Sequence, residues 1–351
     1  MRILIIALSG IGDALMFTPA LKELRKQNPD ARIDALVMFA GVKDIYSRSN
    51  LLDNIYYYDF FNSSYFAALK FLYQFNRKYD YSVNVYPSNR KEYNLISFII
   101  GAKHRCAIKY LRSDFRSLGF LNNLRKKEND SLHNVEENYQ LVEFLLHKKV
   151  SAVNNLIFNL RSEDQDYADE FLSKNNLLKN DVLIGFHPGC STLKNHSNRR
   201  WPAEYFGKLA DKLYENYNAK ILVFGGKDET QLKNDVLKNS SGRNIFVVDT
   251  NNLAQTAAIM KQVNVFVTND SSLMHVASAM QLKVVAIIGP TNENYIHPWM
   301  TEYKIASLKL ECSPCFYHSP RPLSCSRSDK KFKCVLDLYV DSVYQKVIEF
   351  L

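Results

Sequence analysis

The sequence contains no run of about 18 consecutive apolar residues, the length that a helix needs to cross a bilayer. We therefore expect no membrane-spanning segment. Residues 1–8 are apolar, but this run is short and no small-residue cleavage site follows it, so it does not have the pattern of a signal peptide. We interpret it as the first strand of a cytoplasmic enzyme.

The sequence also lacks a basic-aromatic RNA-binding motif and the spacing of a zinc finger, so nucleic acid is not an expected partner. Positive charge is nevertheless in excess, with a formal net charge of +9 and an isoelectric point near 9.0. This excess predicts an anionic partner, such as a nucleotide, a phosphorylated sugar or anionic lipid headgroups.

Much of the positive charge lies between residues 100 and 130. Only three carboxylates accompany it there, those of Asp114, Glu128 and Asp130. Two interpretations are open: a solvated basic loop, or a surface that contacts the acceptor and an anionic membrane, with Phe120 among the apolar neighbours that enter the headgroups. The basic residues are Lys103, Arg105, Lys109, Arg112, Arg116, Arg125, Lys126 and Lys127.

At 351 residues the chain is longer than one typical domain and suits two domains of about 150 to 180 residues each. Hydrophobic residues make up 46% of it, which excludes wholesale disorder. We expect a first domain at residues 1–165 and a second at 178–351, with a polar helix within 161–181 leading to the link. A single last helix is expected over 335–351.

Two segments far apart in the sequence share one pattern, a buried strand that leads through small polar residues directly into a helix. They are residues 3–13 and 265–275. Strands and helices alternate between residues 182 and 288, which indicates a parallel sheet with right-handed crossovers. Ligands bind at the carboxyl ends of the strands in such sheets. We therefore expect an α/β fold of two Rossmann-like domains whose parallel sheets face a central cleft.

Asp13 stands where the first strand meets its helix, and Gly10 and Gly12 before it allow close approach of the backbone. The segment is not a dinucleotide-binding motif, because Leu15 occupies the position of the third glycine. Two roles for Asp13 are open. Spacing alone favours a cap of its own helix, and a carboxylate there can also accept a proton from a substrate hydroxyl.

Polar residues gather at strand ends in the second half as well. Asn269-Asp270-Ser271-Ser272 opens a helix, whose backbone N–H groups and hydroxyls favour a phosphate. His275, further along that helix, either faces this site or packs in the core. Arg199 and Arg200 precede another helix, where guanidinium groups suit a diphosphate, although a surface basic pair is the common alternative.

Together these segments resemble the family 9 glycosyltransferases, typified by the heptosyltransferases of the lipopolysaccharide inner core. The resemblance covers both ends of the chain in the right order, whereas residues 40–160 carry little of it, as expected for a variable acceptor site. It rests on residues 10–21, 187–189, 199–202, 225–229, 270–275 and 289–291.

The resemblance implies a GT-B fold, with the acceptor in the first domain and a nucleotide-sugar donor in the second. It implies that Asp13 is the general base, that Arg199 contacts the donor diphosphate and that Glu229 contacts the nucleoside. Two departures from the family pattern concern the donor site: Ser272 replaces a glycine, and Arg199 replaces a lysine. The donor-site positions that match the family are Arg199, Glu229, Asp270, Ser271, Ser272 and His275.

The implied reaction is an inverting sugar transfer that needs no cofactor for catalysis. ADP-heptose is the donor that the resemblance favours, and a lipid-linked glycan of the lipopolysaccharide core is the acceptor. The expected location is peripheral, at the cytoplasmic face of the bacterial inner membrane. A catalytically silent nucleotide- or glycan-binding protein on the same scaffold is the alternative, as is a transferase that uses another nucleotide sugar.

Four of the six cysteines lie in one segment, residues 312–334. A Cys-x-x-Cys pair followed by two more thiols suits a tetrahedral structural zinc, although the spacing of the second pair is unlike a standard zinc ribbon. Reduced or redox-active thiols are the alternative, because structural disulfides are not expected in the cytosol. The four are Cys312, Cys315, Cys325 and Cys334.

Overall fold

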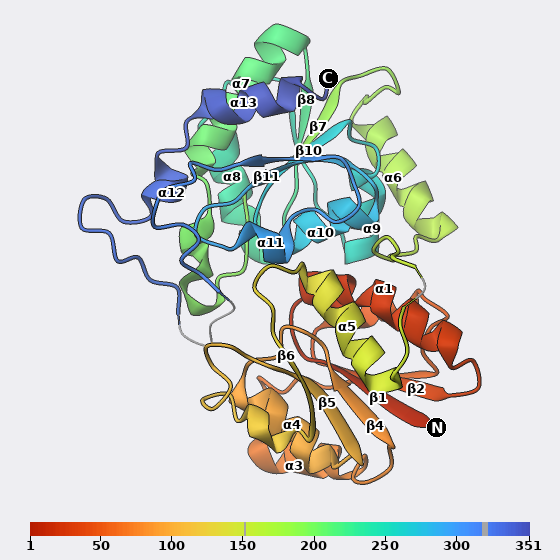
Figure 1. Cartoon of the computed structure of the whole chain (residues 1–351). Helices are drawn as coiled ribbons and strands as arrows, with labels where there is room; N and C mark the ends of the chain where they lie inside the picture. The colour runs from red at the N-terminus through yellow and green to blue at the C-terminus, as the bar shows by residue number, and fades with distance from the viewer. Residues whose placement is uncertain (151, 318–321) are drawn as a thin grey trace. The chain divides into compact units, whose positions relative to one another are not determined.

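The computed structural model describes residues 1–150, 152–317 and 322–351, and it divides into two units (Figure 1). The first unit is Met1–Asn159, and the second begins at Leu160. Each unit is built on one parallel sheet of six strands. Helix α6 (Ser162–Lys174) confirms the helix expected within residues 161–181, and it packs against α9 (Leu253–Met260) inside the second unit.

The sheet of the first unit has the order β3-β2-β1-β4-β5-β6, with neighbouring strands parallel throughout. Its central strands are almost entirely apolar and buried, as in β1 and β2, because helices cover both faces of a parallel sheet. The strands are β1 (Arg2–Ala7), β2 (Arg32–Val37), β3 (Asn54–Tyr57), β4 (Tyr81–Asn84), β5 (His104–Lys109) and β6 (Leu124–Lys127).

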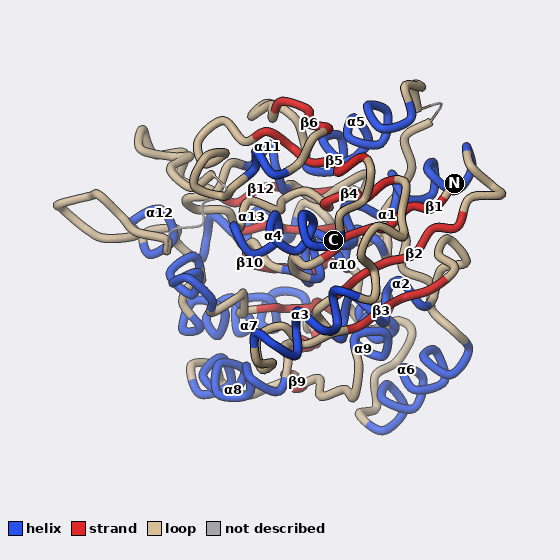
Figure 2. Tube along the Cα trace, turned by 90° about the horizontal axis from the view of Figure 1, so that it is seen from below, coloured by secondary structure: helices blue, strands red, loops and turns tan. Residues whose placement is uncertain are grey.

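The helices of the first unit lie on both faces of this sheet. The connections of α1 and α4 leave the central strands in opposite directions, so right-handed crossovers place these helices on opposite faces. Figure 2 shows the sheet between them. The helices are α1 (Ile11–Gln27), α2 (Ala40–Ser47), α3 (Tyr65–Tyr73), α4 (Lys91–Ile100), the 3-10 turn η1 (Gly119–Leu121) and α5 (Asn134–Leu146).

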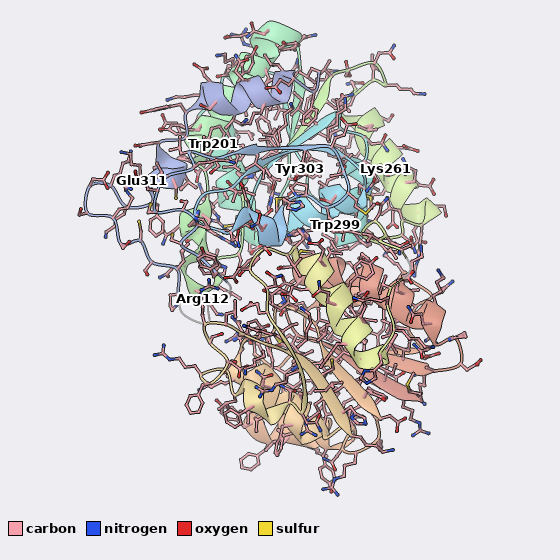
Figure 3. The ribbon with its side chains drawn as sticks, viewed as in Figure 1. Arg112, Trp201, Lys261, Trp299, Tyr303 and Glu311 are labelled. Carbon is pink, nitrogen blue, oxygen red and sulfur yellow. The ribbon has the colours of Figure 1, made fainter. Side chains whose placement is uncertain are left out.

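The basic segment between residues 100 and 130 is not a loop. It forms strands β5 and β6 at the edge of the sheet, joined by a turn that contains η1. Several of its cations are paired with carboxylates, including Arg112 with Asp130, which is drawn in Figure 3. The expectation of a solvated loop is therefore wrong, because the strand pairing fixes the backbone at both ends of the segment.

The second unit repeats the architecture, with the strand order β12-β11-β10-β7-β8-β9. The alternation predicted for residues 182–288 is confirmed, and β12 follows as an edge strand that the sequence did not predict. The strands are β7 (Leu183–His187), β8 (Lys220–Val223), β9 (Ile245–Val247), β10 (Val265–Asn269), β11 (Lys283–Ile287) and β12 (Tyr303–Ala306).

A core of apolar side chains fills the second unit beneath α7 (Ala203–Tyr217) and α13 (Val340–Ile348), with Trp201 fully buried in it (Figure 3). The remaining helices are the 3-10 turns η2 (Leu193–Arg199) and η3 (Lys227–Glu229), followed by α8 (Thr230–Lys238), α10 (Ser272–Ala279), α11 (Glu293–Ile296) and α12 (Lys333–Leu336).

The single helix expected over 335–351 is wrong, because two helices occupy this stretch. Helix α12 ends at Leu336 and α13 begins at Val340. Between them the backbone turns inward, and the indole N–H of Trp201 donates to the carbonyl of Leu338 at 2.7 Å. The buried indole needs this acceptor, so the chain stays non-helical there. Among the residues described, no helix has the length and apolar character to span a membrane.

Candidate functional site

Asp13 lies in the first turn of α1, directly after the carboxyl end of β1. Its Oδ2 accepts a hydrogen bond from the backbone N–H of Gly10 at 3.1 Å. The carboxylate therefore caps the helix, as the spacing indicated, and its negative charge sits at the positive end of the helix dipole. Gly10 has ordinary φ and ψ angles, so no left-handed conformation requires a glycine there.

Three buried tyrosines surround this carboxylate in the first unit. Burial raises the pKa of Tyr93 to about 12, and the nearby charge of Asp13 raises it further. Burial first and then Asp13 also raise the pKa of Tyr46, and the same two causes act on Tyr110. These phenols therefore remain neutral at physiological pH. Asp13 lies among hydroxyl groups at the carboxyl end of the sheet, where a polar substrate is expected.

In the second unit, Arg199 and Asp270 form a buried ion pair. Nη1 of Arg199 lies 2.5 Å from Oδ2 of Asp270, and the hydroxyl of Thr291 donates to the same oxygen at 2.7 Å. These residues come from η2, the end of β10 and the turn after β11, so three chain segments meet at this carboxylate. The arrangement confirms none of the ligand contacts by itself, but it brings Arg199 and Asp270 together.

The opposite edge of the Arg199 guanidinium has weaker partners. Nη2 lies 3.4 Å from Nδ1 of His196, and the buried Nε has no hydrogen-bond partner. Nε of Arg200 is likewise buried without a partner, as is Nε2 of His196. Burial, followed by the charge of Arg199, lowers the pKa of His196 to about 4, so its ring is neutral at pH 7. Buried polar atoms without partners are costly, and a bound anion would satisfy the arginine N–H groups.

His187 connects two of the predicted donor-site residues. Its Nδ1 lies 2.9 Å from Oγ of Ser271, and its Nε2 lies 3.1 Å from Oε2 of Glu229. Burial tends to raise the pKa of Glu229, but the hydrogen bond and charge of His187 and the N–H of Gly226 outweigh it, so the pKa is lowered. Glu229 is therefore an ionised carboxylate, held by groups on both sides.

Gly189 lies against this carboxylate, because a Cβ at residue 189 would come within 1.8 Å of Oε1 of Glu229. Any larger residue would displace Glu229. Arg200 approaches the same carboxylate at 3.7 Å and donates to the carbonyl of Cys190 at 2.8 Å. The His187-Pro188-Gly189 turn and the Arg199-Arg200 pair therefore surround Glu229 from two directions.

His275 is buried in α10, and Nδ1 of its ring has no hydrogen-bond partner. Burial lowers its pKa to about 4, against the opposing effect of Asp270. His275 is thus a neutral buried ring close enough to Asp270 to sense its charge. Ser271 is the N-cap of α10 and Ser272 its first residue, so both lie at the positive end of this helix.

The cysteine-rich segment lies against the donor-site residues. The backbone N–H of Cys315 donates to the carbonyl of Pro290 at 2.9 Å, and Phe316 lies against both His196 and Arg199. Burial raises the pKa of Cys334 to about 11, and neighbouring thiols Cys315, Cys325 and Cys312 raise it further, so the four cysteines are gathered in one region.

The four thiols are free cysteines. Across residues 1–150, 152–317 and 322–351, no group of three or more His, Cys, Asp or Glu side chains is arranged to hold a metal ion. The thiols as they stand do not form a zinc ligand set. Residues 318–321 of the cysteine-rich segment lie outside the described part of the chain.

Sequence reasoning left three residues of this site without a role: His187, Thr291 and Phe316. His187 ends β7, next to β10 in the sheet, so the rule that parallel strands share a carboxyl edge was the signal that could have placed it. Phe316 had no such signal, because it comes from an irregular segment.

The comparisons with known proteins agree with this site. Glycosyltransferase family 9 (heptosyltransferase) matches residues 77–323. The match covers more than half of the chain, and the protein belongs to this family. The matched residues include the whole donor-site group, whereas Asp13 lies before them.

Among curated relatives, lipooligosaccharide heptosyltransferase 2 of Campylobacter jejuni is 33% identical over 177 residues, 49% of this chain. The chain spans about half the length of that relative, 52%. The protein of the same name in Haemophilus ducreyi is 27% identical over 314 residues, which cover 85% of this chain and 86% of the relative.

The structure entitled E. coli ADP-heptose lps heptosyltransferase II superimposes with a TM-score of 0.72 at 19% identity. The superposition covers 100% of this chain and 98% of that one. With the two six-stranded parallel sheets, it confirms the predicted fold of two Rossmann-like domains of the GT-B type.

Proposed function

We propose that this protein transfers heptose from ADP-heptose onto a glycan of the lipopolysaccharide core or a related acceptor. The observation that carries the proposal is the group around Arg199, where buried N–H groups of Arg199 and Arg200 lack acceptors beside the N-terminus of α10. This arrangement suits a diphosphate. The names of the relatives supply the sugar, since both curated proteins are heptosyltransferases and the superimposed structure is entitled with ADP-heptose.

In this proposal Asp270 orients Arg199 for the diphosphate. The ion pair uses Nη1, which leaves the edge formed by Nε and Nη2 for bidentate contact with phosphate oxygens. Because Asp270 holds the guanidinium in place beforehand, little side-chain entropy is lost when the donor binds. As the diphosphate leaves, Arg199 and the α10 terminus stabilise its growing negative charge.

Glu229 and His187 would serve the nucleoside end. An ionised carboxylate accepts hydrogen bonds from ribose hydroxyls, and His187 links it to Ser271 near the diphosphate. One chain of hydrogen bonds would therefore fix both ends of the nucleotide. Ser272, where the family has glycine, would add a hydroxyl at the start of α10.

Asp13 is the proposed general base of an inverting displacement. The acceptor oxygen forms a bond to the anomeric carbon while the bond from that carbon to the diphosphate oxygen breaks, and Asp13 takes the hydroxyl proton. The hydrogen bond from Gly10 occupies only part of the carboxylate, because each carboxylate oxygen has two lone pairs. Capping and base catalysis are therefore compatible.

The rival candidate is a catalytically silent nucleotide- or glycan-binding protein, and a transferase for another nucleotide sugar is the nearer variant. Release of nucleoside diphosphate separates them. We expect release from ADP-heptose that depends on added acceptor, and much less from other nucleotide sugars. Binding without release from any donor would favour the silent protein, and release from a different donor would change the assigned sugar.

We further propose a peripheral location at the cytoplasmic face of the inner membrane, where lipid-linked acceptors are made available to nucleotide sugars. The net charge of +9 supports attraction to anionic lipids. No cofactor takes part in the proposed reaction. A structural zinc at the four clustered cysteines stays a prediction, and no catalytic step depends on it.

A further inference from the structure

Helix α3 presents an unusual amount of aromatic surface to solvent. Tyr65 is 91% exposed, Phe66 87% and Tyr73 74%, with Leu69 about half exposed between them. Leu72 is the buried residue of this helix. Large apolar side chains that gather on one exposed face usually mark an interaction surface.

The exposed side chains are not needed to hold α3 on the unit. Tyr65, Leu69 and Tyr73 are spaced by four residues and therefore share one side of the helix. The other side is anchored by Leu72 and by Phe71, whose ring stacks on Tyr58 with 4.1 Å between centroids. The fold thus buries one side of α3 and leaves a second apolar side without a partner in the described structure.

Helix α4 extends this surface. Leu95 and Phe98 are exposed on it, and α3 and α4 lie side by side in Figures 1 and 2. The C-terminal end of α3 is tied to the end of α4, because the side-chain amide of Asn76 donates to the carbonyl of Ile99 at 2.7 Å. We define the aromatic face as the exposed side chains of both helices: Tyr65, Phe66, Leu69, Tyr73, Leu95 and Phe98.

The charge around the aromatic face is positive. No Asp or Glu occurs between Asp59 and Asp80, while this stretch carries Lys70, Arg77 and Lys78, all exposed. On the side of α4, the guanidinium of Arg105 lies 5.7 Å from the ring centroid of Phe98. Aromatic rings flanked by cations are the composition of surfaces that lie in the headgroup region of anionic bilayers.

We propose that the aromatic face inserts into the surface of a bilayer that carries anionic lipids. Phe66, Leu69 and Phe98 would enter the boundary between headgroups and acyl chains, with Tyr65 and Tyr73 at headgroup level. Lys70, Arg77 and Lys78 would contact lipid phosphates. Both contributions add, since burial of apolar surface and attraction of cations act on the same helix.

This face suits the membrane better than the basic segment at residues 100–130. There Arg125 pairs with Asp114 at 2.9 Å, and Lys126 pairs with Glu137 at 2.7 Å. Paired cations have less charge to offer to lipid phosphates. Lys70, by contrast, stands on a helix that contains no carboxylate.

The position of α3 relates the aromatic face to the acceptor, and this step rests on the proposed function. Helix α3 starts at the carboxyl side of β3, and Asp13 follows the carboxyl end of β1, so both lie at the same edge of the first unit's sheet. Insertion by Tyr65 and Phe66 would therefore bring this edge of the unit toward a lipid-linked glycan.

The test is flotation of the full chain with vesicles of phosphatidylcholine containing phosphatidylglycerol, and with phosphatidylcholine alone, in the absence of donor and acceptor. We expect binding to the anionic vesicles. The triple variant Tyr65→Gln, Phe66→Gln and Tyr73→Gln should reduce it by about tenfold or more. Lys70→Glu, which keeps the apolar side chains, should weaken anionic binding alone.

The matched control replaces exposed apolar residues of the second unit, Leu178→Gln with Tyr339→Gln, and should bind vesicles like the unsubstituted chain. Circular dichroism and thermal unfolding verify that each variant is folded, and Lys70→Glu serves if the triple variant is not. Unchanged vesicle binding by the folded face variants would overturn the proposal. So would a wild-type dimer that the triple variant dissociates without loss of vesicle binding.

A second measurement separates this inference from the proposed reaction. Transfer to a soluble, delipidated acceptor should be the same for the triple variant and the wild type, whereas transfer to acceptor embedded in vesicles should fall. If the wild type shows no transfer with any donor while vesicle binding depends on α3, the proposed reaction fails and the membrane face stands.

Discussion

The ring of Phe316 lies against the guanidinium of Arg199, with 5.8 Å between the ring centroid and Cζ of the arginine. The same ring makes an edge contact with His196 at 5.2 Å. A residue next to the cysteine pair therefore packs on the cation that we assign to the donor diphosphate. This contact links two parts of the sequence that share no motif.

We expect Phe316→Ala to weaken binding of ADP by about three- to tenfold, because a desolvated cation–π contact contributes about 0.5 to 2 kcal/mol. Titration calorimetry with ADP measures it. Phe120→Ala removes an exposed ring of the first unit and is the matched control. Equal affinity in both variants would show that Phe316 does not position Arg199.

Arg199→Ala should weaken ADP binding by about 2 kcal/mol or more, since it also leaves Asp270 buried without its cation. Arg199→Lys should restore only part of the loss. A lysine reaches Asp270 but provides neither the second N–H edge nor the planar group under Phe316. Complete rescue by lysine would mean that only the charge of residue 199 matters, and Arg200 would become the candidate for bidentate contact.

Asp13→Asn should abolish turnover while ADP affinity stays within about threefold of wild type, roughly 0.65 kcal/mol. The asparagine Oδ1 can still accept from Gly10, so this variant keeps the cap and removes the base. Asp13→Ala removes both and should also lower stability by about 1 kcal/mol. Near-normal turnover of Asp13→Asn would leave the carboxylate with capping as its only role.

Stability should fall as the pH drops from about 6.5 to 4. The pKa of His275 is lowered to about 4, and so is that of His196, whereas an unfolded histidine titrates near 6.5. Between these values the unfolded chain binds more protons, so each ring costs about 1.4 kcal/mol per pH unit of acidification. Urea unfolding at several pH values measures this slope. His275→Gln should reduce the slope, and an unchanged slope would exclude His275 as its source.

Metal analysis of the purified chain tests the zinc prediction directly. A structural zinc predicts near-stoichiometric metal that a chelator removes, with loss of ADP affinity because Cys315 adjoins Phe316. Cys315→Ser should then lower both metal content and affinity, whereas Cys106→Ser, in the first unit, should change neither. A metal-free chain of full ADP affinity would leave the cysteines as reduced thiols.

The sequence predicted what repeats along the chain and missed what depends on distant pairing. Strands such as β10 were predictable because apolar runs alternate with helical spacing, and Asp270 followed from its place at a strand end. Phe316 and the break at Leu338 were not, since each depends on a partner more than a hundred residues away in the chain. Helix α3 was missed because its apolar residues occupy both sides, which leaves no clear helical period.

The carbonyl of Leu338 and the ring of Phe316 give the donor site an order of assembly. Trp201 and Arg199 leave the ribosome long before these two partners, so the indole N–H has no acceptor and the guanidinium no ring during most of synthesis. A nascent or truncated chain that ends before residue 316 would contain every donor motif and still lack part of the site. Such a chain should compete poorly for nucleotide with the finished protein.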